Sequence, residues 1–384
     1  MAPVSPIVLA DGNECSLSPV SSTSSVGLPN DIVEEQLVAM LAVEQSYRVA
    51  VVPCTVGDSM TDASTTTRLP YEEWRRKICE WCYKVVDHFR IDREVVGVAL
   101  NFFDRYLVVH KTDDGSKNAN TCRCPSCQRA VDSSTFQLGA MTALYLAIKL
   151  HAETAEDVPH LDEKPRRMKL RLHSFVELSR GQFSSEDIRS MERTMLTSLR
   201  WRVNPPTPMA VVSYLLRLMP KRSCIPLSCR YNYDLVRHVI HELSRYLTEL
   251  SVCLTQVASV ALPSEVAYAS ILVAMDMLTV AALPIQVRDD FCAHVTSVSS
   301  MSSAWDYNVR HLMDRLRNCF SPDMLMDDCD IDRHHPIAIA RELGLLDVSL
   351  MYNSSTRKQA LKTSSNSVML HDQDMEESPI CITP

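Results

Sequence analysis

Residues 136–150 read FQLGAMTALYLAIKL, and this stretch decides the fold. Its apolar side chains fall on almost every side of a helix, so other elements must surround that helix. The run from Val266 to Val287 has the same character in the second half of the chain. Asp276 lies in its middle and Pro284 near its end. Because a charge inside a bilayer costs about 2.5–3.5 kcal/mol, we expect a buried helix here and no membrane span.

Amphipathic segments flank the first buried helix. Before it, apolar side chains recur at three- and four-residue spacing in two stretches, which predicts two helices with one buried face each. After it comes a short helix around Leu172–Ser179, and then Ser184 with Asp187 predicts a capped helix start. Asn204-Pro205-Pro206 ends this fifth helix, because consecutive prolines cannot continue it. The apolar residues of the first two helices are Trp74, Ile78, Trp81, Cys82, Val85, Val86 and Phe89, then Val95, Val96, Ala99, Leu100, Phe102, Phe103, Tyr106 and Leu107.

The second half repeats this layout without repeating the sequence, and its third segment is again the most apolar. The sequence therefore predicts an all-α protein with two five-helix lobes, at 70–205 (with an insertion at 111–134) and 206–325. A Ser/Pro-rich N-terminus (1–30) and a tail (326–384, with a helical turn near Ile337–Leu346) are expected to be mostly disordered. Residues 31–69 are expected to form a short helix and a linker. The five segments of the second half are Pro208–Met219, Tyr233–Leu254, Ser264–Ala282, Pro284–Ser299 and Trp305–Phe320.

The composition narrows the class of function. Of 384 residues, 46% are apolar and 22% are charged, an ordinary globular balance. Only 8 are Gly, which disfavours glycine-rich phosphate loops, and the net charge of −8 gives no attraction to nucleic acid or anionic membrane. HExxH, GxSxG and GxGxxG motifs are absent, so we expect neither an enzyme nor a bound cofactor. The 14 Cys, without a secretory signal, predict reduced thiols in the nucleus and cytoplasm.

Several separated motifs follow one another in a recognisable order. They are Arg75 with Trp81, NFFDRYL at 101–107, QLG at 137–139, AIK at 147–149, FVEL at 175–178, MER at 191–193 and LRWRVNPPTP at 199–208. In this order they resemble the cyclin box, by motif over residues 70–208 and by pattern over 209–320. The ending at 199–208 and the short helix before the box resemble cell-cycle cyclins of the D type.

This resemblance implies a function and a fold of tandem cyclin-like domains. Cyclins are regulatory subunits that bind and activate a cyclin-dependent protein kinase, here at G1 or G1/S of the cell cycle. Two alternatives remain: a transcription-linked cyclin, and a cyclin-fold adaptor that acts in transcription without activating a cell-cycle kinase. The acidic balance and the single dense basic run, at residues 164–171, argue against nucleic acid as a partner.

Lys149 and Glu192 are the candidate kinase-binding residues. Periodicity alone explains Lys149 as a cation at a helix C-terminus and Glu192 as a boundary carboxylate that pairs with an arginine such as Arg189. The resemblance implies instead that both hold the kinase's regulatory helix. Docking would swing that helix inward, so that its glutamate pairs with the ATP-anchoring lysine of the kinase.

Two further sets of residues follow from the resemblance. Arg75 and Asp104 are expected to form a structural ion pair between the first two helices. Substrates or inhibitors of the kinase would dock on a shallow patch, but Lys77 stands where an aliphatic residue is usual and Lys84 where an acid is usual. Core packing explains Ile78 and Trp81 equally well. The patch consists of Trp74, Ile78, Trp81 and Gln137.

Three features lie outside these motifs. Cys122, Cys124 and Cys127, with His110, could bind zinc, but the spacing is not that of paired CxxC motifs, so free surface cysteines are favoured over a metal site. The basic run KPRRMKLR at 164–171 is explained equally well as a nuclear import signal, a partner-facing or phosphate-facing surface, or a solvated helix start. Candidate phosphorylation sites for a proline-directed kinase are Ser5, Ser18, Ser378 and Thr383.

Overall fold

The computed structural model describes residues 30–48, 69–112, 133–151, 170–254, 257, 261–299, 306–320 and 335–347. Within these ranges every regular element is a helix, apart from one isolated β-bridge between Leu278 and Leu346. The all-α prediction is therefore confirmed. None of the described helices is long and apolar enough to span a membrane. The sequence expectations for residues 1–29 and for most of the tail lie outside the described residues.

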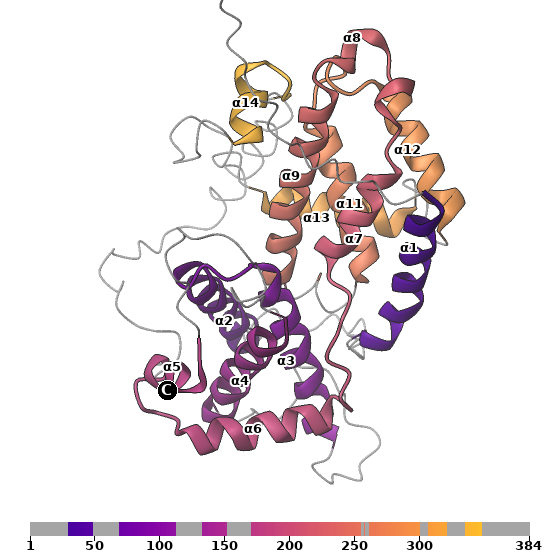
Figure 1. The fold of residues 1–384 in the computed structure, drawn as a ribbon. Coiled ribbons are helices and arrows are strands. Elements are labelled where there is room, and N and C mark those ends of the chain that lie inside the picture. Colours follow the sequence, from indigo (N-terminus) through magenta and orange to yellow (C-terminus); the bar gives the residue numbers. More distant parts are fainter. Residues whose placement is uncertain are drawn as a thin grey trace, which may run out of the picture.

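The N-terminal lobe is built around α4, which is sandwiched between α3 and α6 (Figure 1). Phe136, Met141 and Leu144 on α4 are all 2% exposed or less, as expected for a helix with apolar side chains all round. Gly139 lets α3 approach closely, because a Cβ atom there would come within 3.3 Å of the Phe103 ring. The five helices are α2 (Leu69–His88), α3 (Glu94–Thr112), α4 (Ser133–His151), α5 (Leu172–Leu178) and α6 (Ser185–Ser198).

The C-terminal lobe repeats this plan around α11, which packs against α7, α9 and α13. Helix α11 ends at Asp276, before the predicted Ala282, because the backbone beyond it bonds to a segment near the end of the described chain. Thr279 N–H donates to the Leu345 carbonyl at 2.9 Å, and Asp347 N–H donates to the Met277 carbonyl at 2.8 Å. The helices are α7 (Pro208–Leu215), the short α8 (Leu227–Arg230), α9 (Tyr233–Cys253), α11 (Pro263–Asp276), α12 (Ile285–Val298) and α13 (Tyr307–Cys319).

Two outlying helices also belong to the C-terminal lobe. Helix α1 (Asn30–Glu44) lies beside α7 and α12, and its Val33 and Leu37 are buried in that lobe's core (Figure 1). Glu44 at its end accepts hydrogen bonds from the backbone N–H and the hydroxyl of Ser264, at 3.0 and 2.7 Å. Helix α14 (Pro336–Glu342) packs against α9, so the helical turn expected near Ile337–Leu346 is a docked helix.

The lobes have separate cores and meet where α2 and α3 contact α9. Polar contacts join them there. Arg93, directly before α3, pairs with Glu249 on α9 at 2.5 Å, and the Tyr83 hydroxyl donates to the Glu249 carbonyl at 3.1 Å. The covalent connection passes through Asn204–Thr207, where the Thr207 hydroxyl donates to Glu94 at the start of α3. This junction fixes how the two lobes are set against each other.

Candidate functional site

Helix α6 presents Glu192, and its start is fixed by a capping box. The Ser184 hydroxyl accepts a hydrogen bond from the Asp187 N–H at 3.2 Å, and the Asp187 carboxylate accepts one from the Ser184 N–H at 2.8 Å. The capped start predicted from these two residues is therefore confirmed. Ile188 and Met195 are fully buried against the N-terminal core, which places Glu192 at the edge of the buried stripe.

Glu192 forms an ion pair with Lys149, which lies two residues before the end of α4. The Lys149 Nζ and Glu192 Oε1 atoms are 2.8 Å apart. The lysine side chain is 52% exposed and the glutamate side chain 13%, so the lysine is at the surface and the glutamate is mostly buried. The hydrogen bond to Glu192 raises the pKa of the Lys149 ammonium, which therefore stays charged. Arg189 is not the partner of Glu192, since its guanidinium lies 4.0 Å from Glu186. The two residues implied by the resemblance are thus brought together, with each as the other's partner.

Two exposed apolar side chains lie at the ends of the same two helices. Leu150 follows Lys149 and is 45% exposed, and Trp201, just past α6, is 71% exposed. The ends of α4 and α6 meet because the His151 ring is hydrogen-bonded to the Val203 carbonyl at 2.7 Å. Tryptophan side chains are usually largely buried, and tryptophan is enriched where a partner covers it, so this degree of exposure is uncommon. Site reasoning from the sequence missed both residues; the available signal was an aromatic residue directly after an amphipathic helix.

The backbone holds Trp201 in an unusual conformation. Arg200 and Trp201 have φ angles of 53° and 59°, in the left-handed region that costs about 1–2 kcal/mol per non-glycine residue. Arg105 from α3 stabilises this segment, because its guanidinium donates to the Arg202 carbonyl at 2.8 Å and to the Leu199 carbonyl at 3.3 Å. The tryptophan is therefore held outward by contacts made behind it.

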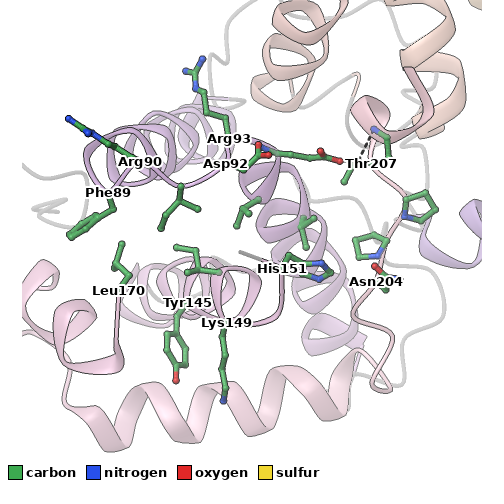
Figure 2. Close-up of a pocket in the computed structure, with 18 of the residues that line it drawn as sticks. Phe89, Arg90, Asp92, Arg93, Tyr145, Lys149, His151, Leu170, Asn204 and Thr207 are labelled. Carbon is green, nitrogen blue, oxygen red and sulfur yellow. Dashed lines mark hydrogen bonds between the residues drawn. The ribbon is translucent and has the colours of Figure 1, made fainter. Parts of the chain in front are cut away.

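A cleft of about 1410 Å³ borders the C-terminal half of α4 (Figure 2). Its wall contains the corner Phe89–Glu94 between α2 and α3, the segment Leu170–Leu172 that leads into α5, and the linker Asn204–Thr207. Lys149 and Tyr145 reach from α4 toward α6, and the Lys149 nitrogen lies 5.7 Å from the centre of the Tyr145 ring. Lys149 thus stands at the border between the cleft and the α4–α6 surface.

Arg75 and Asp104 form the structural ion pair that the resemblance implied. The Arg75 Nη2 and Asp104 Oδ2 atoms are 2.9 Å apart, and the arginine side chain is 1% exposed. Arg75 also donates from Nη1 to the Val252 carbonyl at 2.6 Å. This ion pair therefore joins three helices, α2, α3 and the end of α9, and one of them belongs to the other lobe.

The residues of the predicted docking patch are mostly interior. Ile78, Trp81 and Gln137 are 5%, 6% and 5% exposed, and the Gln137 side-chain carbonyl accepts a hydrogen bond from Gln182 at 3.1 Å. Trp74 lies in α2, but its side chain is outside the described residues. A peptide would meet only the edges of the three described side chains, so substrate or inhibitor docking here stays a prediction.

Other sequence predictions fall on residues that the structure does not describe. These are the zinc candidates Cys122, Cys124 and Cys127, the phosphorylation candidates Ser5, Ser18, Ser378 and Thr383, and most of the basic run at 164–171. Among the described residues, no group of three or more His, Cys, Asp or Glu side chains could hold a metal ion.

The similarity to known proteins lies in the N-terminal lobe. Residues 57–204 match the family model for the cyclin N-terminal domain. G1/S-specific cyclin-E1 of Rattus norvegicus is 27% identical over 141 residues, which cover 37% of this chain and 26% of that protein. Cyclin-D3-3 of Arabidopsis thaliana is 26% identical over 143 residues, which cover 37% of this chain and 32% of that protein. The matches therefore span about a quarter to a third of these relatives' length.

Solved structures match this chain at low sequence identity. A viral cyclin from herpesvirus saimiri is 12% identical, with a TM-score of 0.42, over 76% of this chain and 97% of that chain. The helices described above define this chain as an all-helical protein with two lobes of similar plan. The family match identifies its N-terminal lobe as a cyclin N-terminal domain.

Proposed function

We propose that this protein is a regulatory subunit that binds and activates a cyclin-dependent protein kinase. The observation that carries the proposal is the Lys149–Glu192 pair at 2.8 Å on the surface formed by the ends of α4 and α6. Leu150, the neighbour of Lys149 in sequence, and Trp201, three residues past the end of α6, are exposed as well. A partner helix that covers this surface would bury the apolar side chains and turn the two charges into desolvated, directional hydrogen-bonding groups.

The chemistry of the pair suits recognition of a helix and the backbone beside it. An ammonium group can donate three hydrogen bonds and a carboxylate can accept several, so each retains capacity for a partner while paired. Charge-assisted hydrogen bonds are strong where water is excluded. Activation would follow from position alone: the docked regulatory helix of the kinase turns inward, and its glutamate pairs with the ATP-anchoring lysine that active kinases require.

The names of the relatives support action at G1 or G1/S. Proteins named as G1/S-specific cyclin-E1 and Cyclin-D3-3 match 141 and 143 residues of this chain. We therefore propose control of cell-cycle progression, with the nucleus and cytoplasm as the compartments. A transcription-linked role is the alternative, and the identity of the captured kinase decides between them.

A charge exchange tests the binding surface. The full chain is expressed with an affinity tag in dividing cells, and the captured protein is assayed for kinase activity and for the identity of the bound kinase. Lys149→Glu combined with Glu192→Lys preserves the internal ion pair but reverses both charges toward a partner. We expect the exchanged protein to fold as the wild type does and to lose at least tenfold of the captured kinase activity.

The matched control is Glu186→Ala with Arg189→Ala. It removes one acid and one base from the same helix, at positions whose side chains are 68% and 59% exposed. This control should capture as much kinase as the wild type. Undiminished capture by the charge-exchanged protein would contradict the assignment of this surface, and capture of no kinase by the wild type would contradict the function itself.

A further inference from the structure

Three cysteines gather where the two lobes meet. Cys79 and Cys82 lie on α2, and Cys253 is the last residue of α9. The sulfur atoms of Cys79 and Cys253 are 2.8 Å apart, although 174 positions separate the residues in sequence. Both cysteines of α2 are buried in the core of the N-terminal lobe. The contact with Cys253 gives Cys79 a partner in the other lobe.

The two thiols of this contact have different surroundings. Cys79 is fully buried and Cys253 is partly exposed, so Cys253 is the more accessible of the two to a small oxidant. Arg75 lies one turn before Cys79, and its guanidinium donates a hydrogen bond to the carbonyl of Val252 at 2.6 Å. Val252 is the neighbour of Cys253 in sequence. A cation beside a partly exposed thiol is the environment in which cysteines become reactive.

The pKa values of the two thiols also differ, in line with their surroundings. The hydrogen bond with Cys79 lowers the pKa of the Cys253 thiol, and Arg75 acts in the same direction. The same hydrogen bond, together with burial, raises the pKa of the Cys79 thiol. Of the two thiols, Cys253 therefore ionises more readily than Cys79. In disulfide chemistry the thiol that ionises more readily is the attacking cysteine and the other is the resolving cysteine.

We propose that Cys79 and Cys253 are an oxidation site at which hydrogen peroxide closes a reversible disulfide between the two lobes. The Cys253 thiolate attacks one oxygen of the peroxide, the O–O bond breaks, and the departing hydroxide takes a proton to become water. Cys253 is then a sulfenic acid. The Cys79 sulfur attacks the Cys253 sulfur, the S–O bond breaks, and the thiol proton leaves with the hydroxide as a second water. Two thiols are oxidised and one peroxide is reduced, so the electrons balance.

The bond would lie at the contact that sets the lobes against each other. Within the described part of the chain, α2 and α9 are joined there by hydrogen bonds from Arg75 and Tyr83 to carbonyls of α9. A disulfide beside these contacts would make the junction covalent. It would resist separation of the lobes and constrain the unfolded chain, so oxidation should stabilise the protein.

Peptide mapping of the full chain tests this site. Reduced protein is treated with hydrogen peroxide under native conditions, and remaining thiols are alkylated with N-ethylmaleimide. Mass spectrometry of the digest should then reveal a Cys79–Cys253 cross-linked peptide that has lost two hydrogens. We expect it in the wild type and in Cys82→Ser, and its disappearance after dithiothreitol. The Tm of the wild type should rise on oxidation and return on reduction.

The decisive variant is Cys253→Ser, because its side chain is partly exposed and the change leaves the core intact. It should fold, form no such peptide and show no rise in Tm with peroxide. Cys224→Ser is the background control, since Cys224 is exposed and lies away from the junction, on the segment before α8. Three outcomes would overturn the site: full alkylation of Cys253 after peroxide, a cross-link of Cys253 to Cys82, or a sulfinic acid at Cys253 without any cross-link.

Discussion

Arg75 carries a full charge into the interior of the protein, where a charge is tolerated only if its hydrogen bonds are satisfied. Its Nε and Nη2 atoms reach the two oxygens of Asp104 at 3.4 and 2.9 Å, in the forked geometry that suits a guanidinium and a carboxylate. Its Nη1 reaches the Val252 carbonyl in the other lobe. The guanidinium is therefore satisfied by the Asp104 carboxylate on α3 of its own lobe and by a backbone carbonyl on α9 of the C-terminal lobe.

Removal of the acid from this pair should be costly. Asp104→Ala leaves the buried guanidinium without its counter-charge, so we expect the free energy of unfolding to fall by about 3–5 kcal/mol. Urea unfolding followed by circular dichroism measures the change. Arg76→Ala is the control one position along α2, where a surface pair with Glu80 has side chains 57% and 49% exposed. The control should change stability by about 0.5 kcal/mol or less. Equal effects of the two substitutions would show that Arg75 needs no counter-charge.

At the scale of residues, the sequence predicts which residues are important better than it predicts which residues are in contact. The resemblance predicted the Arg75–Asp104 ion pair and identified Lys149 and Glu192 as candidate kinase-binding residues, because each of the four belongs to a motif that is local in sequence. It did not supply the pairing of Lys149 with Glu192, nor the outward position of Trp201, which depends on φ angles that the residue type disfavours. It also could not supply the Cys79–Cys253 contact, because no local pattern links residues 174 positions apart.

At the scale of elements, helix type was predictable because it rests on local periodicity. Helices α4 and α11 carry apolar residues on all sides, and both are the surrounded helices of their lobes. The start of α6 was predictable from two residues. The end of α11 was not, since the segment after Asp276 is held by bonds to residues near position 346. The docking of α1 on the second lobe was also hidden, because its partners are distant in sequence.

The cap of α6 gives a prediction at this scale. Ser184→Ala removes the side-chain acceptor for the Asp187 N–H, so we expect a loss of about 1 kcal/mol in the free energy of unfolding. Ser190→Ala is the control, because Ser190 is exposed in the interior of the same helix and alanine is the better helix former. Chemical denaturation of both variants measures the difference. A loss of stability at Ser190 as large as at Ser184 would show that the cap contributes nothing specific.

At the scale of the whole molecule, the junction between the lobes contains a buried acid. The Glu249 side chain is 14% exposed, and burial raises the pKa of its carboxyl. Arg93 and Arg245 oppose that rise, whereas Asp87 and Asp92 add to it. A raised carboxyl pKa means that the folded state binds the proton more tightly than the unfolded state. Its effect on stability is therefore most favourable at low pH and declines as pH rises through the folded pKa.

Arg93→Ala should make the protein more sensitive to rising pH. Without the guanidinium the ionised carboxylate loses its main counter-charge, so the pKa of Glu249 rises further. We expect a small loss of stability at pH 4, from the lost contact with the Tyr83 ring, and a larger loss of about 1–2 kcal/mol at pH 7. Urea unfolding at a series of pH values measures both. Lys84→Ala, an exposed cation on α2, should show no such dependence. A difference between wild type and Arg93→Ala that is constant with pH would contradict this account of Glu249.

The placement of α1 has a consequence for the order in which the protein is made. Its terminal Glu44 binds Ser264, which lies 220 positions later in the chain. Its Val33 and Leu37 pack into a core whose other members all come after the whole N-terminal lobe. On the ribosome, α1 therefore emerges well before the residues that it packs against. The buried core residues of the N-terminal lobe are all translated while the apolar face of α1 is still exposed to chaperones, so α1 is secured later than the lobe that follows it in sequence.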